Sequence, residues 1–103
     1  MSADLRADRE RRMRAQSDIA LIKATRRAGD LRRQMSTAEG RRFVFSLLEA
    51  TGYMGEGWSK DARETDFLQG RRSIGCALAR ELVSVDAATY QAMQSEAINV
   101  SGE

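Results

Sequence analysis

A helical run with two internal glycines, residues 61–83, places the strongest constraint on how this chain folds. Its large apolar residues recur at intervals of seven, four and four, at Phe67, Ile74, Leu78 and Leu82. That spacing is typical of one face of a helix. Gly70 and Gly75 lie inside the run, and each costs roughly 1 kcal/mol relative to alanine in a helix interior. We therefore expect a central helix that a second helix approaches closely at the glycines.

A second helix is indicated between residues 36 and 52. Ser36 and Glu39 have the spacing of a capping box, in which a hydroxyl caps the helix and a glutamate follows three residues later. Gly52 stands where a left-handed C-cap residue is expected. The core face of this helix is predicted to carry Phe43, Val44, Leu47, Leu48 and Thr51.

Two further helices flank this pair. Residues 18–35 carry a narrow apolar stripe, at Ile19, Ile22, Ala24, Ala28, Leu31 and Met35. Ser17 or Asp18 is the expected N-cap, and Gly29–Asp30 either breaks this helix or lies within a continuous one, which we favour. A last helix is predicted from about residue 87 to 97, with Asp86 as its N-cap. Its inward face is expected to hold Tyr90, Met93 and Ala97.

The expected fold is all-α, a small bundle of about four helices with a long, basic amino-terminal helix or arm. The chain has no proline, and alternating strand patterns are absent from the sequence. Residues 1–17 form a charged arm that we expect to be frayed or disordered unless a partner orders it. Residues 18–97 form the helical domain, and residues 98–103 are predicted to be a frayed tail.

The loop at residues 53–60 is rich in glycine and carries Tyr53, Met54 and Trp58. These large side chains have two interpretations. They fold back over the open end of the core, or Trp58 and Tyr53 form a surface that binds a partner protein, since aromatic residues dominate interface hot spots.

Charge is distributed unevenly along the chain. Residues 1–35 contain ten basic and five acidic residues, whereas the remainder contains seven basic and ten acidic residues. The candidate nucleic-acid contacts in the arm are Arg9, Arg11, Arg12, Arg14, Arg26 and Arg27. Because acidic residues are interleaved with them, a solvated helix surface with internal ion pairs is the alternative interpretation.

A Gly-Arg-Arg triplet occurs twice, thirty positions apart, at residues 40–42 and 70–72. Its arginines are Arg41, Arg42, Arg71 and Arg72. They are candidates either for ion pairs between helices or for contacts with a neighbouring subunit or DNA.

Most catalytic and metal-binding chemistry lacks its usual residues here. The chain has no histidine and a single cysteine, Cys76, which excludes an internal disulfide, a Cys–His nucleophile and a zinc site of the common kinds. The glycines at residues 52–57 lack the spacing of a phosphate-binding loop. No apolar run is long enough to span a membrane. We expect no enzyme activity, no catalytic or metal-binding residues, and no cofactor.

Residues 30–93 resemble the Bbp19-like phage domain family. The residues that carry the resemblance are Asp30-Leu31, the run Ser36–Phe43, Leu47-Leu48-Glu49, Gly52, the run Phe67–Gly75, Tyr90 and Met93. The resemblance implies a tailed-phage or prophage protein from the region of the head genes, without an established activity or catalytic residues.

Taken together, the residues and the resemblance predict a structural or assembly component of a tailed-phage virion, located in the portal-proximal interior or the head–tail region. Its expected partners are other virion proteins (the portal or neighbouring head and tail proteins), further copies of itself and, as an open question, packaged DNA. We expect it in the virion, and in the host cytoplasm during assembly. The alternative is a phage-encoded DNA-binding or regulatory protein that acts in the host cytoplasm.

Overall fold

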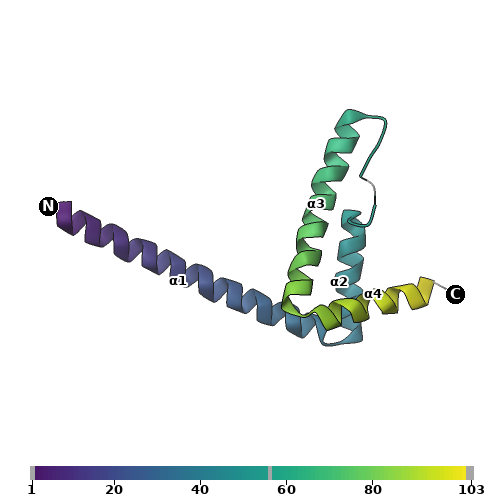
Figure 1. Ribbon diagram of the computed structural model, residues 1–103, viewed down its shortest axis with the longest axis horizontal. Helices are drawn as coiled ribbons and strands as arrows, with labels where there is room; N and C mark the ends of the chain where they lie inside the picture. The colour runs from purple at the N-terminus through teal and green to yellow at the C-terminus, as the bar shows by residue number, and fades with distance from the viewer. Residues whose placement is uncertain (1, 56, 102–103) are drawn as a thin grey trace. The chain divides into compact units, whose positions relative to one another are not determined.

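The computed structural model describes residues 2–55 and 57–101, which form four helices and no strand (Figure 1). The helices are α1 (Ser2–Met35), α2 (Ala38–Thr51), α3 (Ala62–Val85) and α4 (Ala87–Ser101). The expected all-α architecture is therefore confirmed. The last helix is longer than predicted, because it continues past residue 97 into the segment expected to fray.

The chain divides into two compact units, Met1–Asp30 and Leu31–Glu103. The described part of the first unit is a single helix, the greater part of α1, and nearly all of its residues are exposed. The division falls after Asp30 rather than after residue 17 as expected. The reason is that Leu31 is partly buried against the core and Met35 is 2% exposed, so packing on the core begins there.

Helix α1 is continuous, which is the outcome favoured over a break at Gly29–Asp30. It passes through Gly29–Asp30 without a break, and it begins at Ser2 rather than at a cap near residue 17. Good helix formers (alanine, arginine and glutamate) predominate in its first half, and Arg11 pairs with Asp8 one turn away. Local propensity and pairing thus support a helix over residues for which a frayed arm was expected.

The ends of α2 are defined by side-chain and backbone hydrogen bonds. The Thr37 hydroxyl accepts a hydrogen bond from the Gly40 backbone N–H at 3.0 Å, so the cap is one residue later than predicted. The Ser36 hydroxyl instead donates to the Arg33 carbonyl at 2.6 Å, where it satisfies a free carbonyl at the end of α1. Gly52 has a φ of 66°, which confirms the predicted left-handed C-cap.

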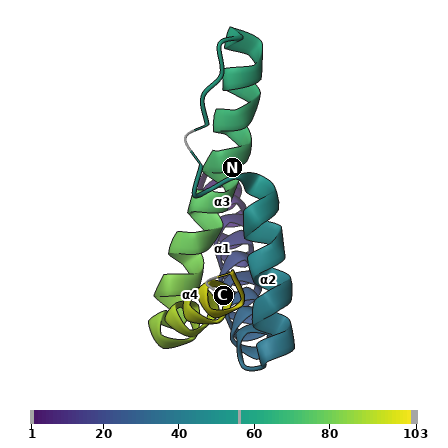
Figure 2. The same ribbon diagram turned by 90° about the vertical axis from the view of Figure 1, so that its right-hand side faces the viewer.

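Helices α2 and α3 run side by side, and α4 lies across one side of the pair (Figures 1 and 2). Asp86 begins α4, where its carboxylate accepts hydrogen bonds from the backbone N–H groups of Ala88 and Thr89, as predicted. The buried core consists of Met35, Val44, Leu48, Tyr53, Ala79, Leu82 and Met93. Each helix of the second unit therefore contributes to one small core.

Gly75 is the position of closest approach between α2 and α3. A Cβ atom at Gly75 would lie 1.9 Å from the Thr51 Oγ1 and 2.7 Å from the Tyr53 Cβ. A Cβ at Gly70 would meet no heavy atom within 4 Å. The predicted close approach is confirmed at Gly75 and wrong at Gly70.

The apolar faces predicted for α2 and α3 are partly wrong. Val44, Leu48 and Leu82 are buried, but four of the large predicted core residues point outward: Phe43 (61% exposed), Leu47 (47%), Phe67 (66%) and Ile74 (67%). The buried line of α3 passes through Gly75 and Ala79. Small residues there let the two backbones approach, and this rotates the larger neighbouring side chains away from the contact.

We expect Gly75→Ala to destabilise the second unit by about 1–3 kcal/mol, because the new methyl group overlaps Thr51 and Tyr53. Gly70→Ala is the matched control within the same helix. It meets open space, so it should raise stability by roughly 0.5–1 kcal/mol through improved helix propensity. Urea denaturation followed by circular dichroism measures both. Equal effects of the two substitutions would contradict the packing described.

Candidate interaction surfaces

Arg41 connects three helices of the second unit. Its Nη2 lies 2.8 Å from the Glu96 Oε1 on α4, and its Nε donates to the same carboxylate at 3.0 Å. Its Nη1 donates to the Met35 carbonyl at the end of α1, at 2.9 Å. Hydrogen bonds from Arg41 lower the pKa of Glu96, and the Glu96 carboxylate raises the pKa of Arg41. Arg41 therefore forms the inter-helix ion pair that was one of its two interpretations.

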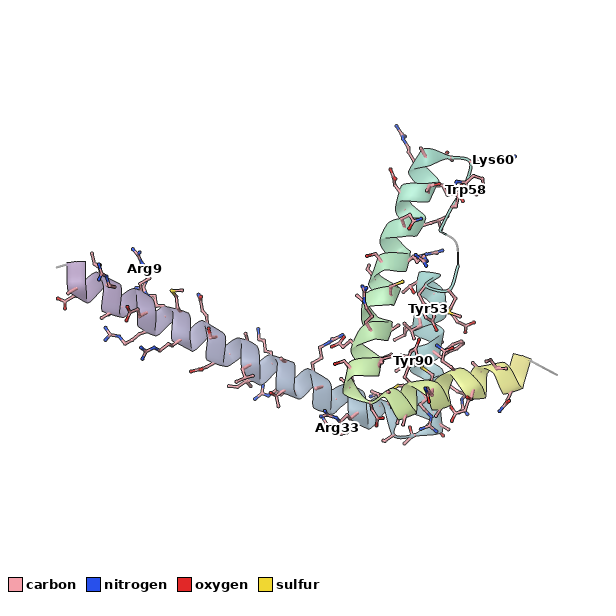
Figure 3. The ribbon with its side chains drawn as sticks, in the orientation of Figure 1. Arg9, Arg33, Tyr53, Trp58, Lys60 and Tyr90 are labelled. Carbon is pink, nitrogen blue, oxygen red and sulfur yellow. The ribbon has the colours of Figure 1, made fainter. Side chains whose placement is uncertain are left out.

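Tyr53 is buried beside α4, within a group of three polar side chains. The Gln94 amide donates to the Tyr53 hydroxyl at 2.6 Å and to the Tyr90 hydroxyl at 2.9 Å. Burial is the largest cause of a raised pKa for Tyr53. Figure 3 labels Tyr53 beside α2 and Tyr90 beside α4. Tyr53 thus connects the end of α2 to α4 and lies mostly away from solvent.

A groove of about 430 Å³ lies between α2 and α4. Phe45, Met93, Ala97 and Val100 give it an apolar lining. Arg42, Glu49 and Glu96 add charged groups of both signs to its lining. Because Glu96 is held by Arg41, the groove has one fixed carboxylate and presents mixed charge rather than one sign.

The four outward-pointing residues of α2 and α3 lie on one side of the helix pair. On α2, Phe45 and Glu49 line the groove with α4, and the helical rotation of about 100° per residue places Phe43 and Leu47 on the opposite flank. On α3, Cys76 approaches the Tyr53 carbonyl on the α4 side, so Phe67 and Ile74 fall on the far flank. We call Phe43, Leu47, Phe67 and Ile74 the α2–α3 apolar face.

The remaining Gly-Arg-Arg arginines occupy different surroundings. Arg71 is exposed, with its guanidinium carbon 5.7 Å from the centre of the Phe67 ring, beside the apolar face. Arg72 is half-buried, and its Nε is buried without a hydrogen-bond partner. The two triplets therefore do not form a single basic patch, since Arg41 and Arg42 face α4.

The large side chains of the 53–60 loop do not share one role: one covers the core, and the others are exposed. Tyr53 covers the core, whereas Met54 and Trp58 are exposed. Figure 3 places Trp58 and Lys60 in the loop near the start of α3, far from Tyr90. Trp58 therefore remains a candidate contact for a partner protein, and Tyr53 does not.

The candidate arginines of α1 are all exposed: Arg9, Arg11, Arg12, Arg14, Arg26 and Arg27. At about 100° per residue they are distributed around the helix rather than along one face. Figure 3 shows Arg9 pointing away from the helix axis. The first unit thus presents cations in several directions, with Asp8 paired to Arg11 among them.

Neither a metal-binding cluster nor a spanning helix is found in the part of the chain that the structure describes. No three histidine, cysteine, aspartate or glutamate side chains there are placed to hold a metal ion. None of the described helices is both long enough and apolar enough to cross a membrane.

Sequence reasoning missed Glu96, Gln94 and the α2–α4 groove. Glu96 and Gln94 lie within three residues of Met93, which was predicted to face inward, so their proximity to the core was available from the sequence. Their partners, Arg41 and Tyr53, are 55 and 41 residues away. Only the tertiary arrangement identifies such pairs.

In a comparison with known protein families, residues 31–95 match the family model described as Bbp19-like phage protein. No curated protein and no solved structure matches the chain. The matched residues begin where the second compact unit begins, and they end one residue before Glu96.

The Arg41–Glu96 pair should make stability dependent on pH in the acidic range. Because the folded-state pKa of Glu96 is lowered, its contribution is present above the unfolded-state pKa and is lost as pH falls through the folded-state pKa. We expect Glu96→Gln to lower the thermal midpoint near pH 7, with the difference from wild type shrinking as pH falls below the ordinary range of a glutamate pKa. Glu49→Gln, at another carboxylate of the same groove, controls for the loss of a charge. A difference that is constant with pH would contradict this assignment.

Proposed function

The chain belongs to the Bbp19-like phage protein family, and from this membership we propose that it is a structural or assembly component of a tailed-phage virion. The proposal places it in the portal-proximal interior or the head–tail region, in several copies. Its partners are neighbouring virion proteins and further copies of itself. It is present in the host cytoplasm during assembly and in the virion afterwards.

The α2–α3 apolar face is the observation that carries this proposal. Two phenylalanines, a leucine and an isoleucine are between 47% and 67% exposed on one side of a single helix pair. Large apolar side chains exposed together on one side of a small domain mark a site of protein–protein contact. A protein that acts by assembling with others requires such a surface, whereas a small enzyme would instead require a pocket with convergent reactive groups.

The ionisable groups with shifted pKa values also support a non-enzymatic role. Among the residues that the structure describes, such groups include Arg41, Glu96 and Tyr53, and each has a partner that holds two helices together. Perturbed groups that mark a catalytic site lie in a cleft where a substrate can reach them. Glu96 does line the α2–α4 groove, but Arg41 holds its carboxylate, and Tyr53 is bonded to Gln94. We therefore propose that the protein has no catalytic activity and uses no cofactor.

The second candidate function is a DNA-binding or regulatory protein of the host cytoplasm, and the exposed arginines of α1 favour it. Their spread around the helix supports contact with phosphates rather than base-specific recognition from one face. The same arginines suit packaged DNA, or an acidic neighbour, inside a virion. The two candidates therefore differ in location more than in chemistry.

Quantitative mass spectrometry of gradient-purified mature particles and of empty precursors tests the proposed function. We expect the protein in particles at a fixed ratio to the portal. Presence in precursors alone would identify an assembly factor that leaves on maturation. Absence from both would overturn the virion role and leave the regulatory role.

A salt titration of DNA binding tests the role of α1. We expect Arg9→Gln/Arg12→Gln to reduce the slope of log affinity against log salt by roughly 0.9 for each phosphate that the variant no longer neutralises. Arg63→Gln/Arg80→Gln removes two exposed arginines of α3 and should leave the slope unchanged. Equal reductions would mean that binding follows net charge alone, and the assignment to α1 would then be wrong.

A further inference from the structure

We propose that the α2–α3 apolar face is covered by the same face of a second copy of this chain, so that two α2–α3 pairs form an antiparallel four-helix arrangement. This proposal deepens the proposed function. It rests on that function in one respect, namely that self-association is part of assembly. The occupant is argued from the area of the face and from the distribution of charge along its edges.

The four residues of the face supply more than half of the area that each partner of a stable dimer buries. With about 200 Å² for a whole phenylalanine and somewhat less for leucine or isoleucine, the exposed fractions of the four residues amount to about 450 Å² of apolar surface. A stable interface buries roughly 800 Å² on each partner. The exposed Ala50 and Ala77 and the half-buried Leu78 border the four residues and extend the surface toward that value.

The small residues among the large ones suit close helix packing. Gly70 and Ala77 lie on the outward flank of α3 beside Phe67 and Ile74, and a Cβ at Gly70 would meet nothing within 4 Å. Alternation of large and small side chains lets a facing helix insert its own large residues. The open space at Gly70, which nothing within the second unit fills, is therefore available to a second copy.

Charge along the edges of the face is self-complementary. The basic residues Arg63 and Arg71 lie toward the start of α3, whereas Glu81 lies toward its end and Glu39 lies at the start of α2. Because α2 and α3 are antiparallel, Glu39 and Glu81 are at the same end of the pair, opposite to the arginines (Figure 2). A parallel arrangement of two copies would place like charges together.

A two-fold axis perpendicular to the helices removes that conflict. It reverses the second copy, so that the basic end of each face meets the acidic end of the other. Centring this axis near Cys76 on α3 sets Ile74 opposite Leu78 of the second copy. It also brings Arg71 to the level of the second copy's Glu81, which has a further interaction within its own chain. The same axis brings α2 of the two copies together near Ala50, beside Leu47. Leu47 on α2 and Ile74 and Leu78 on α3, which lie nearest to the axis, are then covered by one operation.

Sedimentation equilibrium of the full chain, from about 1 µM to about 1 mM, tests the self-association. We expect a species of twice the 11.5 kDa chain mass, and a roughly 100-fold weaker association for Ile74→Ser, because each dimer loses two buried isoleucines. Ile98→Ser is the matched control, since Ile98 is 66% exposed on α4, away from this face, against 67% for Ile74. It should leave the association unchanged.

Charge exchange tests the antiparallel arrangement separately. Arg71→Glu should weaken the dimer, and Arg71→Glu/Glu81→Arg should restore it, whereas a different contact between copies would show no restoration. Circular dichroism confirms that each variant is folded.

A monomeric wild type throughout the concentration range would overturn the proposal and assign the face to a different protein. An unchanged dimer in Ile74→Ser would also overturn it, by placing the contact elsewhere. Either failure is distinguishable from failure of the virion role, which is decided by the content of purified particles.

Discussion

The close approach of α2 and α3 at Gly75 is the constraint on which the second unit depends. A Cβ at this position would overlap both Thr51 and Tyr53, so no other residue allows the same separation of the helices. The approach fixes which residues of α3 face inward, namely Gly75, Ala79 and Leu82. It also positions Tyr53 so that its hydroxyl meets Gln94 of α4. A single missing side chain thereby determines both the core and the surface left outside it.

The surface left outside the core follows directly from this geometry. A helix contact that runs along small residues must turn the neighbouring large residues to its flanks. One flank is covered by α4, through Met93, Glu96 and Ala97, and the Arg41–Glu96 pair holds α4 there. The other flank carries the α2–α3 apolar face, which is exposed within the described chain. The fold of one copy and its proposed association with another therefore have the same physical origin.

Much of the fold was available from the sequence, because it depends on local signals. The Gly52 C-cap, the Asp86 N-cap and the inward position of Met93 were all predicted, since each follows from residue type and helical spacing. The outward rotation of Phe67 and Ile74 was not predicted. Periodicity identifies an apolar face but does not say whether its large or its small residues make the contact. Interaction partners distant in sequence, such as Glu96 for Arg41, also required the tertiary structure.

An isotope-filtered nuclear Overhauser experiment on a mixture of methyl-labelled and unlabelled protein tests the central claim most directly. The account predicts intermolecular contacts from the Ile74 methyl groups of one copy to Leu78 of the other, and no contacts from Ile74 to Thr51 or Tyr53 of its own chain. Intramolecular contacts from Ile74 to Thr51 and Tyr53 would place Ile74 in the core. That result would contradict both the Gly75 packing and the apolar face derived from it.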